Sequence, residues 1–222
     1  MLPVAILALV LVQSTSASAQ YDSTQYPRID KPVYFGYEIG AGVMCQTLTS
    51  NIPQLRHLSV PMQGATVGVK WGNTRGALRA QGGLYYSGGA VPYSIDMVSG
   101  GVSGNLYMLR LKNVVYHTFE PYALVSLTYQ QTKFFGTYLN NNGKNRSISE
   151  EPELGQINMY SASAGAGVEF QLENATYQFI HFFAEAKYGF PMRSKGSNPD
   201  FSNTQINTPF WFTVGMSFGK FK

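Results

Sequence analysis

Apolar side chains alternate with polar or small ones in eight successive segments of the chain, beginning at residue 33. Successive residues of an extended strand point to opposite faces, so this period of two places the apolar residues of each segment on one face. The pattern predicts eight β-strands, at residues 33–46, 64–71, 78–86, 107–112, 120–130, 160–172, 180–190 and 210–219. The fold class that follows is all-β.

The two faces of the predicted strands differ in charge. No Lys, Arg, Asp or Glu lies on an apolar face, whereas the opposite faces carry glycines with four acids, four bases and one histidine: Glu38, Lys70, Arg79, Arg110, Glu120, Glu169, His181, Glu185 and Lys187. Balanced charges suit a closed interior, because an unpaired buried charge costs several kcal/mol. A Lys or Arg facing lipid at mid-depth would cost about 2–4 kcal/mol. We therefore expect these nine residues to form an interior polar network, with the apolar faces turned toward hydrocarbon.

The connections between the predicted strands alternate in length. Those after the odd strands are long, at residues 48–63, 87–101, 133–158 and 192–208, and those after the even strands are short, at 72–76, 113–119 and 173–178. This alternation is typical of barrels in the outer membrane of diderm bacteria. We predict an eight-stranded antiparallel up-and-down transmembrane β-barrel over residues 33–222. It is not a general porin, because side chains fill an eight-stranded interior.

Residues 1–19 have the features of an export signal. An apolar run from Leu2 to Val12 precedes Ala17-Ser18-Ala19, a small-x-small cleavage site. The run is shorter than the roughly 20 apolar residues that cross a bilayer as a helix, and no second long apolar run follows. Residues 20–32 are then a periplasmic lead-in to the barrel. The charged fraction is 13%, about half of the usual 25% or so, which fits a chain whose surface is largely out of water.

The C-terminal strand and two further segments carry a family resemblance. Thr213-x-Gly215-x-x-Phe218 partly matches the spacing of an outer-membrane assembly signal, although Lys220 stands where a further apolar residue is expected. Together with Ala17-Ser18-Ala19-Gln20, Tyr37-Glu38-Ile39-Gly40-Ala41-Gly42 and Val214-Gly215-Met216-Ser217-Phe218-Gly219-Lys220, it resembles the small outer-membrane β-barrel domain family of Bacteroidota. The resemblance implies the fold and the location in the outer membrane. Most members of that family have no assigned activity, so it implies little about function.

The sequence gives few signs of catalysis or of a bound cofactor. His57, His117 and His181 are expected at different levels of the barrel, which argues against a shared metal site. A single cysteine, Cys45, excludes an internal disulfide. The net charge of +4 is spread along the chain, so nucleic-acid binding is not expected. We predict no enzyme activity, no cofactor and no metal. Trp211 falls on the inner face of its strand, and we expect it near the periplasmic end.

Basic residues in the predicted loops are candidate contacts at the cell surface. Lys144 and Arg146 lie in the third long loop, and Arg193 and Lys195 in the fourth. We expect them to contact lipopolysaccharide phosphates, other outer-membrane lipid or a protein partner. The predicted function is that of a non-enzymatic integral outer-membrane protein with a structural, interaction or surface-binding role.

Three other functions stay open. A soluble or secreted lipocalin-like barrel would bind a small apolar ligand. An outer-membrane lipid hydrolase would use His57 near the outer rim, with Ser50, Ser59 and Asp96 as nearby candidates. An accessory subunit of a secretion or assembly complex would have the same fold and would differ only in its partner.

Overall fold

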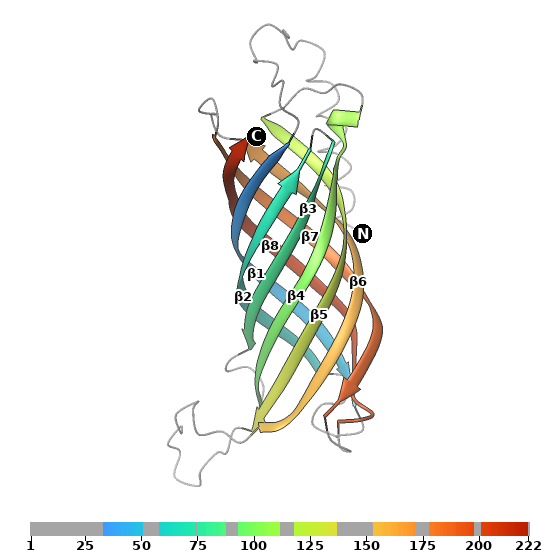
Figure 1. Cartoon of the computed structure of the whole chain (residues 1–222). Helices are drawn as coiled ribbons and strands as arrows, with labels where there is room; N and C mark the ends of the chain where they lie inside the picture. Colours follow the sequence, from blue (N-terminus) through green and yellow to red (C-terminus); the bar gives the residue numbers. More distant parts are fainter. Residues whose placement is uncertain are drawn as a thin grey trace, which may run out of the picture. The chain divides into compact units, whose positions relative to one another are not determined.

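The structure is a computed structural model that describes residues 33–50, 58–73, 75–87, 93–111, 118–136, 153–171, 178–197 and 201–221. Within these ranges, antiparallel strands form one closed eight-stranded barrel (Figure 1), which confirms the predicted fold class. The strands are β1 Tyr34–Thr49, β2 Leu58–Gly72, β3 Gly76–Ser87, β4 Tyr93–Tyr107, β5 Phe119–Gly136, β6 Glu153–Gln171, β7 Gln178–Gly196 and β8 Gln205–Phe221, and a 3-10 helix, η3 Leu109–Leu111, follows β4. No helix in these ranges is long and apolar enough to cross a membrane. The predicted export signal and lead-in, residues 1–32, lie outside them.

Each strand pairs with its neighbour in the sequence, and β8 closes the wall against β1. Tyr34 lies opposite both Gly72 on β2 and Phe221 on β8, so the first strand begins where the last one ends. The β2–β3 turn, η3 and the end of β8 lie at the end of the barrel drawn uppermost in Figure 1. We call this the short-turn end, and the opposite end, where β1, β3, β5 and β7 finish, the long-loop end.

The fourth strand differs from the prediction. It occupies Tyr93–Tyr107, most of which was expected to be loop, and Leu109–Leu111 of the expected strand forms η3. The lengths of its two connections are therefore reversed, with residues 88–92 before the strand and 108–118 after it. The predicted alternation of long and short connections fails around this strand.

The sequence of β4 explains why its alternation is hard to see. Ile95 and Met97 are buried in the barrel, whereas Val98 and Val102 are exposed on the outer wall. Apolar residues thus lie on both faces at the long-loop end of the strand. Gly100, Gly101 and Gly104 interrupt the pattern in its middle.

Most other strands extend further toward the long-loop end than the sequence predicted. The strand β2 begins at Leu58, β5 continues to Gly136, β6 begins at Glu153 and β7 continues to Gly196. Arg193 and Lys195, which were predicted to lie in a loop, are therefore on a strand. The added segments were missed because their polarity is opposite to that of the rest of the barrel.

The outer wall carries an apolar band bounded by aromatic rings. Phe119 on β5 packs on Phe170 on β6, with ring centroids 5.2 Å apart. Ten residues further along the same strands, Tyr129 packs on Tyr160 at 5.0 Å. Ten residues rise about 33 Å along a strand, and about 23 Å across a barrel whose strands tilt by about 45°. Exposed apolar side chains cover the wall between these levels, among them Ile39, Val67, Leu84, Val102, Val125 and Leu127. The height of this band is that of a lipid-facing barrel surface.

Beyond the Tyr129–Tyr160 pair the polarity of the wall reverses. The outer face there carries mostly polar side chains: Asp96, Gln131, Lys133, Gln156, Asn158, Arg193, Lys195 and Asn207. Leu154 and Met192 are also exposed there. The inner face is filled by an apolar plug: Met44, Leu48, Val60, Met62, Tyr85, Ile95, Met97, Phe134, Ile157, Met159, Phe201, Ile206 and Trp211. Trp211 points inward as predicted, but it lies in this plug and not at the short-turn end, where we expected it. One end of the barrel is thus inside-out, and the other has the polarity of a barrel in water.

Candidate functional site

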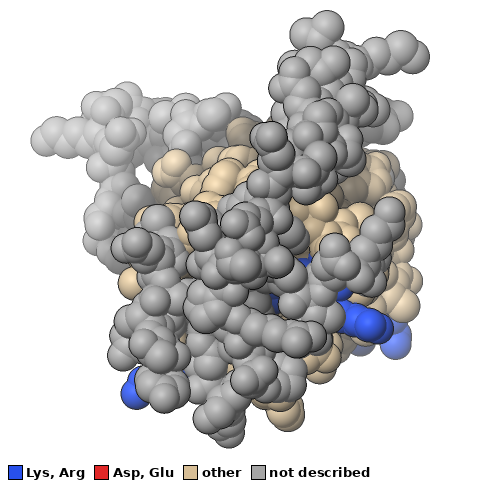
Figure 2. Space-filling model, turned by 90° about the horizontal axis from the view of Figure 1, so that it is seen from above, with Lys and Arg blue, Asp and Glu red and all other residues tan. Residues whose placement is uncertain are grey.

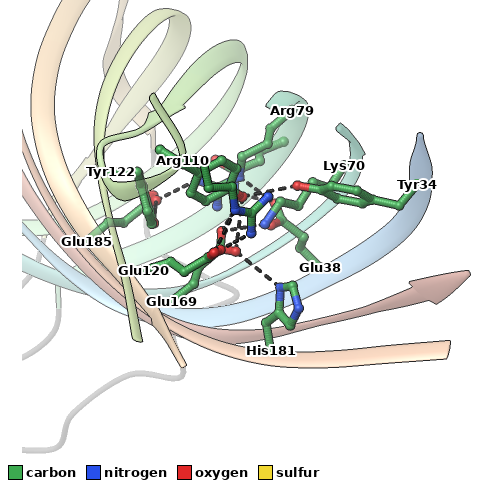
Figure 3. A network of polar contacts seen from close by, with 12 residues as sticks. Tyr34, Glu38, Lys70, Arg79, Arg110, Glu120, Tyr122, Glu169, His181 and Glu185 are labelled. Carbon is green, nitrogen blue, oxygen red and sulfur yellow. Dashed lines mark hydrogen bonds and ion pairs between the residues drawn. The ribbon is translucent and has the colours of Figure 1, made fainter. Parts of the chain in front are cut away.

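The short-turn half of the lumen contains a cluster of buried ions, drawn in Figure 3 with their side chains pointing toward one another. Eight of the nine residues predicted to face inward are at most 4% exposed: Glu38, Lys70, Arg79, Arg110, Glu120, Glu169, His181 and Glu185. They come from β1, β2, β3, η3, β5, β6 and β7. We call these eight residues the lumen network.

Arg79 on β3 joins two carboxylates, one on β1 and one on β7. Its Nε donates to Glu38 Oε2 at 2.6 Å, and its Nη1 donates to Glu185 Oε2 at 2.5 Å. The guanidinium lies 5.0 Å from the centre of the Phe183 ring. Tyr122 adds a hydrogen bond from its hydroxyl to Glu185 Oε2 at 3.0 Å. Residues of β1, β3, β5 and β7 are therefore tied together across the interior.

Glu169 is the centre of a second group. Lys70 Nζ donates to its Oε1, and the Tyr107 hydroxyl lies 3.0 Å from both carboxylate oxygens. His181 Nδ1 lies 3.1 Å from Oε2. The hydroxyls of Tyr34 and Tyr107 are 3.1 Å apart, which links the group to β1. The carboxylate thus has both cationic and neutral partners.

Arg110 pairs with Glu120 through two nitrogens, with Nε donating to Oε1 at 2.6 Å and Nη2 donating to Oε2. The guanidinium stacks 4.1 Å from the centre of the Tyr107 ring. Arg110 was predicted to be on a strand, but it lies on η3 and its side chain turns back into the barrel. The side chain is 1% exposed there.

Lys187 is separate from these groups. It is half-buried, and its Nζ lies 5.3 Å from the centre of the Trp211 ring, at the edge of the apolar plug. It makes no ion pair with another residue in the described part of the chain. Three tyrosines whose hydroxyls contact these ions or one another were not among the predicted lumen residues. Tyr34 and Tyr122 fell on the charged faces of their predicted strands, but Tyr107 was expected to face outward. The position of Tyr34 and Tyr122 on the charged face of a strand was the sequence feature that could have identified them as lumen residues.

The charges of the lumen network pair with one another inside the barrel and are not directed toward a ligand. Every carboxylate in it has a cationic partner within hydrogen-bond distance. Figure 2 views the molecule from the short-turn end, and the described atoms in that view include basic side chains but no acidic ones. The carboxylates are directed inward, where they hold the strands together.

The described residues contain no group of three metal-ligating side chains. His57 and His117 lie outside the described residues. Ser50 Oγ lies 2.6 Å from Thr204 Oγ1, and Ser59 Oγ lies 3.3 Å from Cys45 Sγ. These contacts supply neither an acid nor a base, so they give no support to a hydrolase site.

The outer rim is the polar surface that β5, β6 and β7 present beyond the Tyr129–Tyr160 pair, and it consists of Gln131, Lys133, Gln156, Asn158, Arg193 and Lys195. Asn158 Oδ1 accepts hydrogen bonds from the Tyr129 hydroxyl at 3.1 Å and from Gln156 Nε2 at 3.0 Å. Lys133 Nζ is 3.1 Å from Glu153 Oε2. Of the other predicted contact residues, Lys144 and Arg146 lie outside the described residues.

A hollow of about 870 Å³ lies on the outer wall of β8, β1, β2, β3 and β4. Small residues line it at Ala41, Gly42 and Gly64, with Leu84 and Phe212 at its sides. Leu84 and Phe212 are exposed on the outer surface, whereas Tyr85 and Met97, which also border the hollow, are buried in the apolar plug.

No family model matches the chain, and no curated protein matches it. Solved structures do share its fold. Neisserial surface protein A aligns over 83% of this chain and 97% of its own, with 10% identity and a TM-score of 0.54. A major outer membrane protein of Thermus thermophilus aligns over 83% and 98%, with 9% identity and a TM-score of 0.45. The attachment invasion locus protein of Yersinia pestis aligns over 86% and 98%, with 11% identity and a TM-score of 0.41. The first likeness shows a fold shared with a small bacterial surface protein.

Proposed function

We propose that this chain is a non-enzymatic integral outer-membrane β-barrel. In this proposal the long-loop end stands beyond the outer leaflet, and its polar rim contacts lipid or a partner at the cell surface. Residues 1–19 serve as the export signal and residues 20–32 as a periplasmic lead-in. The resemblance noted in the sequence points to the Bacteroidota group of such barrels.

The reversal of polarity along the wall carries the proposal. Between the two aromatic pairs, apolar residues face outward and ions face inward, as a hydrocarbon environment requires. Beyond Tyr129 and Tyr160, polar residues face outward and the apolar plug fills the interior, as water requires. A soluble lipocalin-like barrel would have the second arrangement along its whole length. This chain has it only at the long-loop end.

The test is the accessibility of single cysteines in intact cells. The native thiol is first removed by Cys45→Ser, and then Arg75→Cys is placed in the β2–β3 turn and Asn203→Cys at the long-loop end. Both positions are exposed. We expect a membrane-impermeant maleimide to label Asn203→Cys on intact cells and Arg75→Cys only after the outer membrane is permeabilised.

Cell fractionation provides the second readout for the same variants. Recovery with outer membranes is expected. Recovery in a detergent-free soluble fraction would contradict the proposal, as would labelling of both cysteines in intact cells. An accessory subunit of a larger complex would show the same labelling, but would co-purify from native membranes with a fixed partner.

A further inference from the structure

Two basic side chains on the outer rim lie beside a polar and an aromatic residue of the next strand. In the pairing of β6 with β7, Arg193 is opposite Tyr160 and Lys195 is opposite Asn158. Directly opposite residues on one face have Cβ atoms about 5 Å apart, and residues two apart along a strand are about 7 Å apart. The four side chains therefore share one small area of the surface.

This area lies at the edge of the apolar band. Tyr188 and Phe190 are exposed on β7 just below Arg193, and their rings pack against each other at 5.4 Å. Tyr160 is 55% exposed beside them. A molecule held here meets cationic groups on the side toward the long-loop end and apolar rings on the side toward the band.

The positive charge of the area is not neutralised by the described part of the chain. Arg193 and Lys195 are both exposed, and neither makes an ion pair with a described residue. Lys133, the other base of the outer rim, is paired with Glu153 and lies opposite Gln156 on the far side of β6. Asn158 uses its Oδ1 for its contacts with neighbouring side chains, which leaves its Nδ2 hydrogens as donors.

We propose that Arg193 and Lys195, with the amide of Asn158, bind the phosphate of an anionic lipid of the outer leaflet. The acyl chains of that lipid lie on Tyr188 and Phe190. Guanidinium and ammonium groups form charge-assisted hydrogen bonds with phosphate oxygens. The inference rests on the proposed function, because it needs the Tyr129–Tyr160 level to coincide with the outer leaflet surface.

The experiment measures lipid binding by the full barrel folded in detergent, using native mass spectrometry. The probes are diphosphoryl lipid A, the same lipid after enzymatic removal of its phosphates, and inorganic phosphate. We expect the R193Q/K195Q double variant to bind diphosphoryl lipid A about tenfold more weakly than the unaltered protein, since it loses charge-assisted contacts. Removal of the phosphates from the lipid should produce a similar loss for the unaltered protein.

The matched control is Lys133→Gln, which removes a base at the same level that is already paired. It should bind diphosphoryl lipid A within twofold of the unaltered protein. Equal binding by the double variant would overturn the inference, and so would a loss in K133Q as large as in the double variant. Full competition by inorganic phosphate at equal concentration would also overturn it, because the acyl chains would then contribute nothing.

The outcome is separable from that of the proposed function. If N203C is labelled from outside but the double variant binds lipid A normally, the phosphate site is wrong and the outer-membrane barrel stands. If N203C is not labelled from outside, the proposed function itself fails. Binding of heparin in place of lipid A, with the same dependence on Arg193 and Lys195, would mean that the area recognises an acidic glycan and not a lipid.

Discussion

Glu169 has a lysine, a histidine and a tyrosine within hydrogen-bond distance of one buried carboxylate. In a lumen closed by side chains, each of these groups depends on the others for its hydrogen bonds. Removing one of these side chains leaves the others in place without the hydrogen bond or the opposite charge that it supplied. The energetic consequence falls mainly on the group that stays charged, which here is Lys70.

Glu169→Gln should therefore destabilise the barrel strongly. The change keeps the shape of the side chain and removes its charge, so Lys70 is left as a buried unpaired cation. Breaking a buried pair in this way costs about 3–5 kcal/mol. The measurement is the free energy of unfolding from urea titrations of the barrel folded into lipid vesicles.

Two further variants separate charge from packing in that experiment. The double variant K70M/E169L should recover most of the lost stability, because it removes both ions together. Glu153→Gln breaks the exposed pair with Lys133 and should change stability by less than about 1 kcal/mol. An E169Q barrel as stable as the E153Q barrel would show that the lumen ions do not hold the strands.

Strand phase and charge balance pointed to eight residues that lie buried in the lumen and to Lys187, which lies apart from them, but they gave no individual pairing. Arg79 reaches Glu38 and Glu185, which are separated from it by 41 and 106 positions in the sequence. Which carboxylate meets which base depends on how far each strand is shifted along its neighbours. Periodicity within one strand carries no information on that shift.

At the scale of single strands, glycine positions separate the crowded lumen from the open outer wall. A Cβ at Gly215 on β8 would lie 2.3 Å from the carbonyl oxygen of Ile39 and 2.6 Å from the ring of Phe183. Phe183 also supports Arg79, so the site is packed on two sides. By contrast, a Cβ at Gly100 on β4 would meet no atom within 4 Å.

Gly215→Ala should thus lower the free energy of unfolding by about 1–3 kcal/mol, the usual effect of overpacking. Gly100→Ala is the matched control, and it should be neutral or stabilise by up to about 1 kcal/mol. Both values come from the same urea titration in vesicles. Equal effects at the two positions would contradict the assignment of inner and outer faces.

The strands also show where sequence patterns lose their meaning. In β6, one alternating pattern persists through the band. The predicted end of this strand at the short-turn end, residue 172, lies one residue beyond the observed end at Gln171. In β4, the same rule pointed to the wrong residues because Ile95 and Met97 belong to the apolar plug. A period-two pattern identifies a face only while the environment of that face stays the same.

At the scale of the whole molecule, the two tryptophans of the chain report on opposite sides of the wall. Trp71 is 63% exposed at the short-turn end of the band, and Trp211 is 2% exposed in the plug. In vesicles made with brominated lipid, W211F should lose much of its fluorescence, because its remaining Trp71 faces the acyl chains. W71F should be quenched little, and strong quenching of W71F would place Trp211 on the outside.

A charge on the outer wall should cost more stability in the middle of the apolar band than beyond the Tyr129–Tyr160 pair. Val125 lies in the middle of β5 on the outer wall, and Gln131 lies on the same face beyond Tyr129. Val125→Lys should cost about 2–4 kcal/mol in lipid vesicles and Gln131→Lys about 0–1 kcal/mol. Equal stability of the two variants would mean that the apolar band does not face hydrocarbon.

The seam between β1 and β8 has a consequence for biogenesis. Tyr34 on β1 pairs with Phe221 on β8, so the ring cannot be completed before β8 has been synthesised. Before β1 and β8 pair, the sheet has two edge strands with unpaired backbone N–H and C=O groups, and lipid acyl chains cannot form hydrogen bonds with them. Stepwise entry of hairpins into the bilayer is thus disfavoured, and β1 and β8 have to pair before or while the barrel enters the membrane.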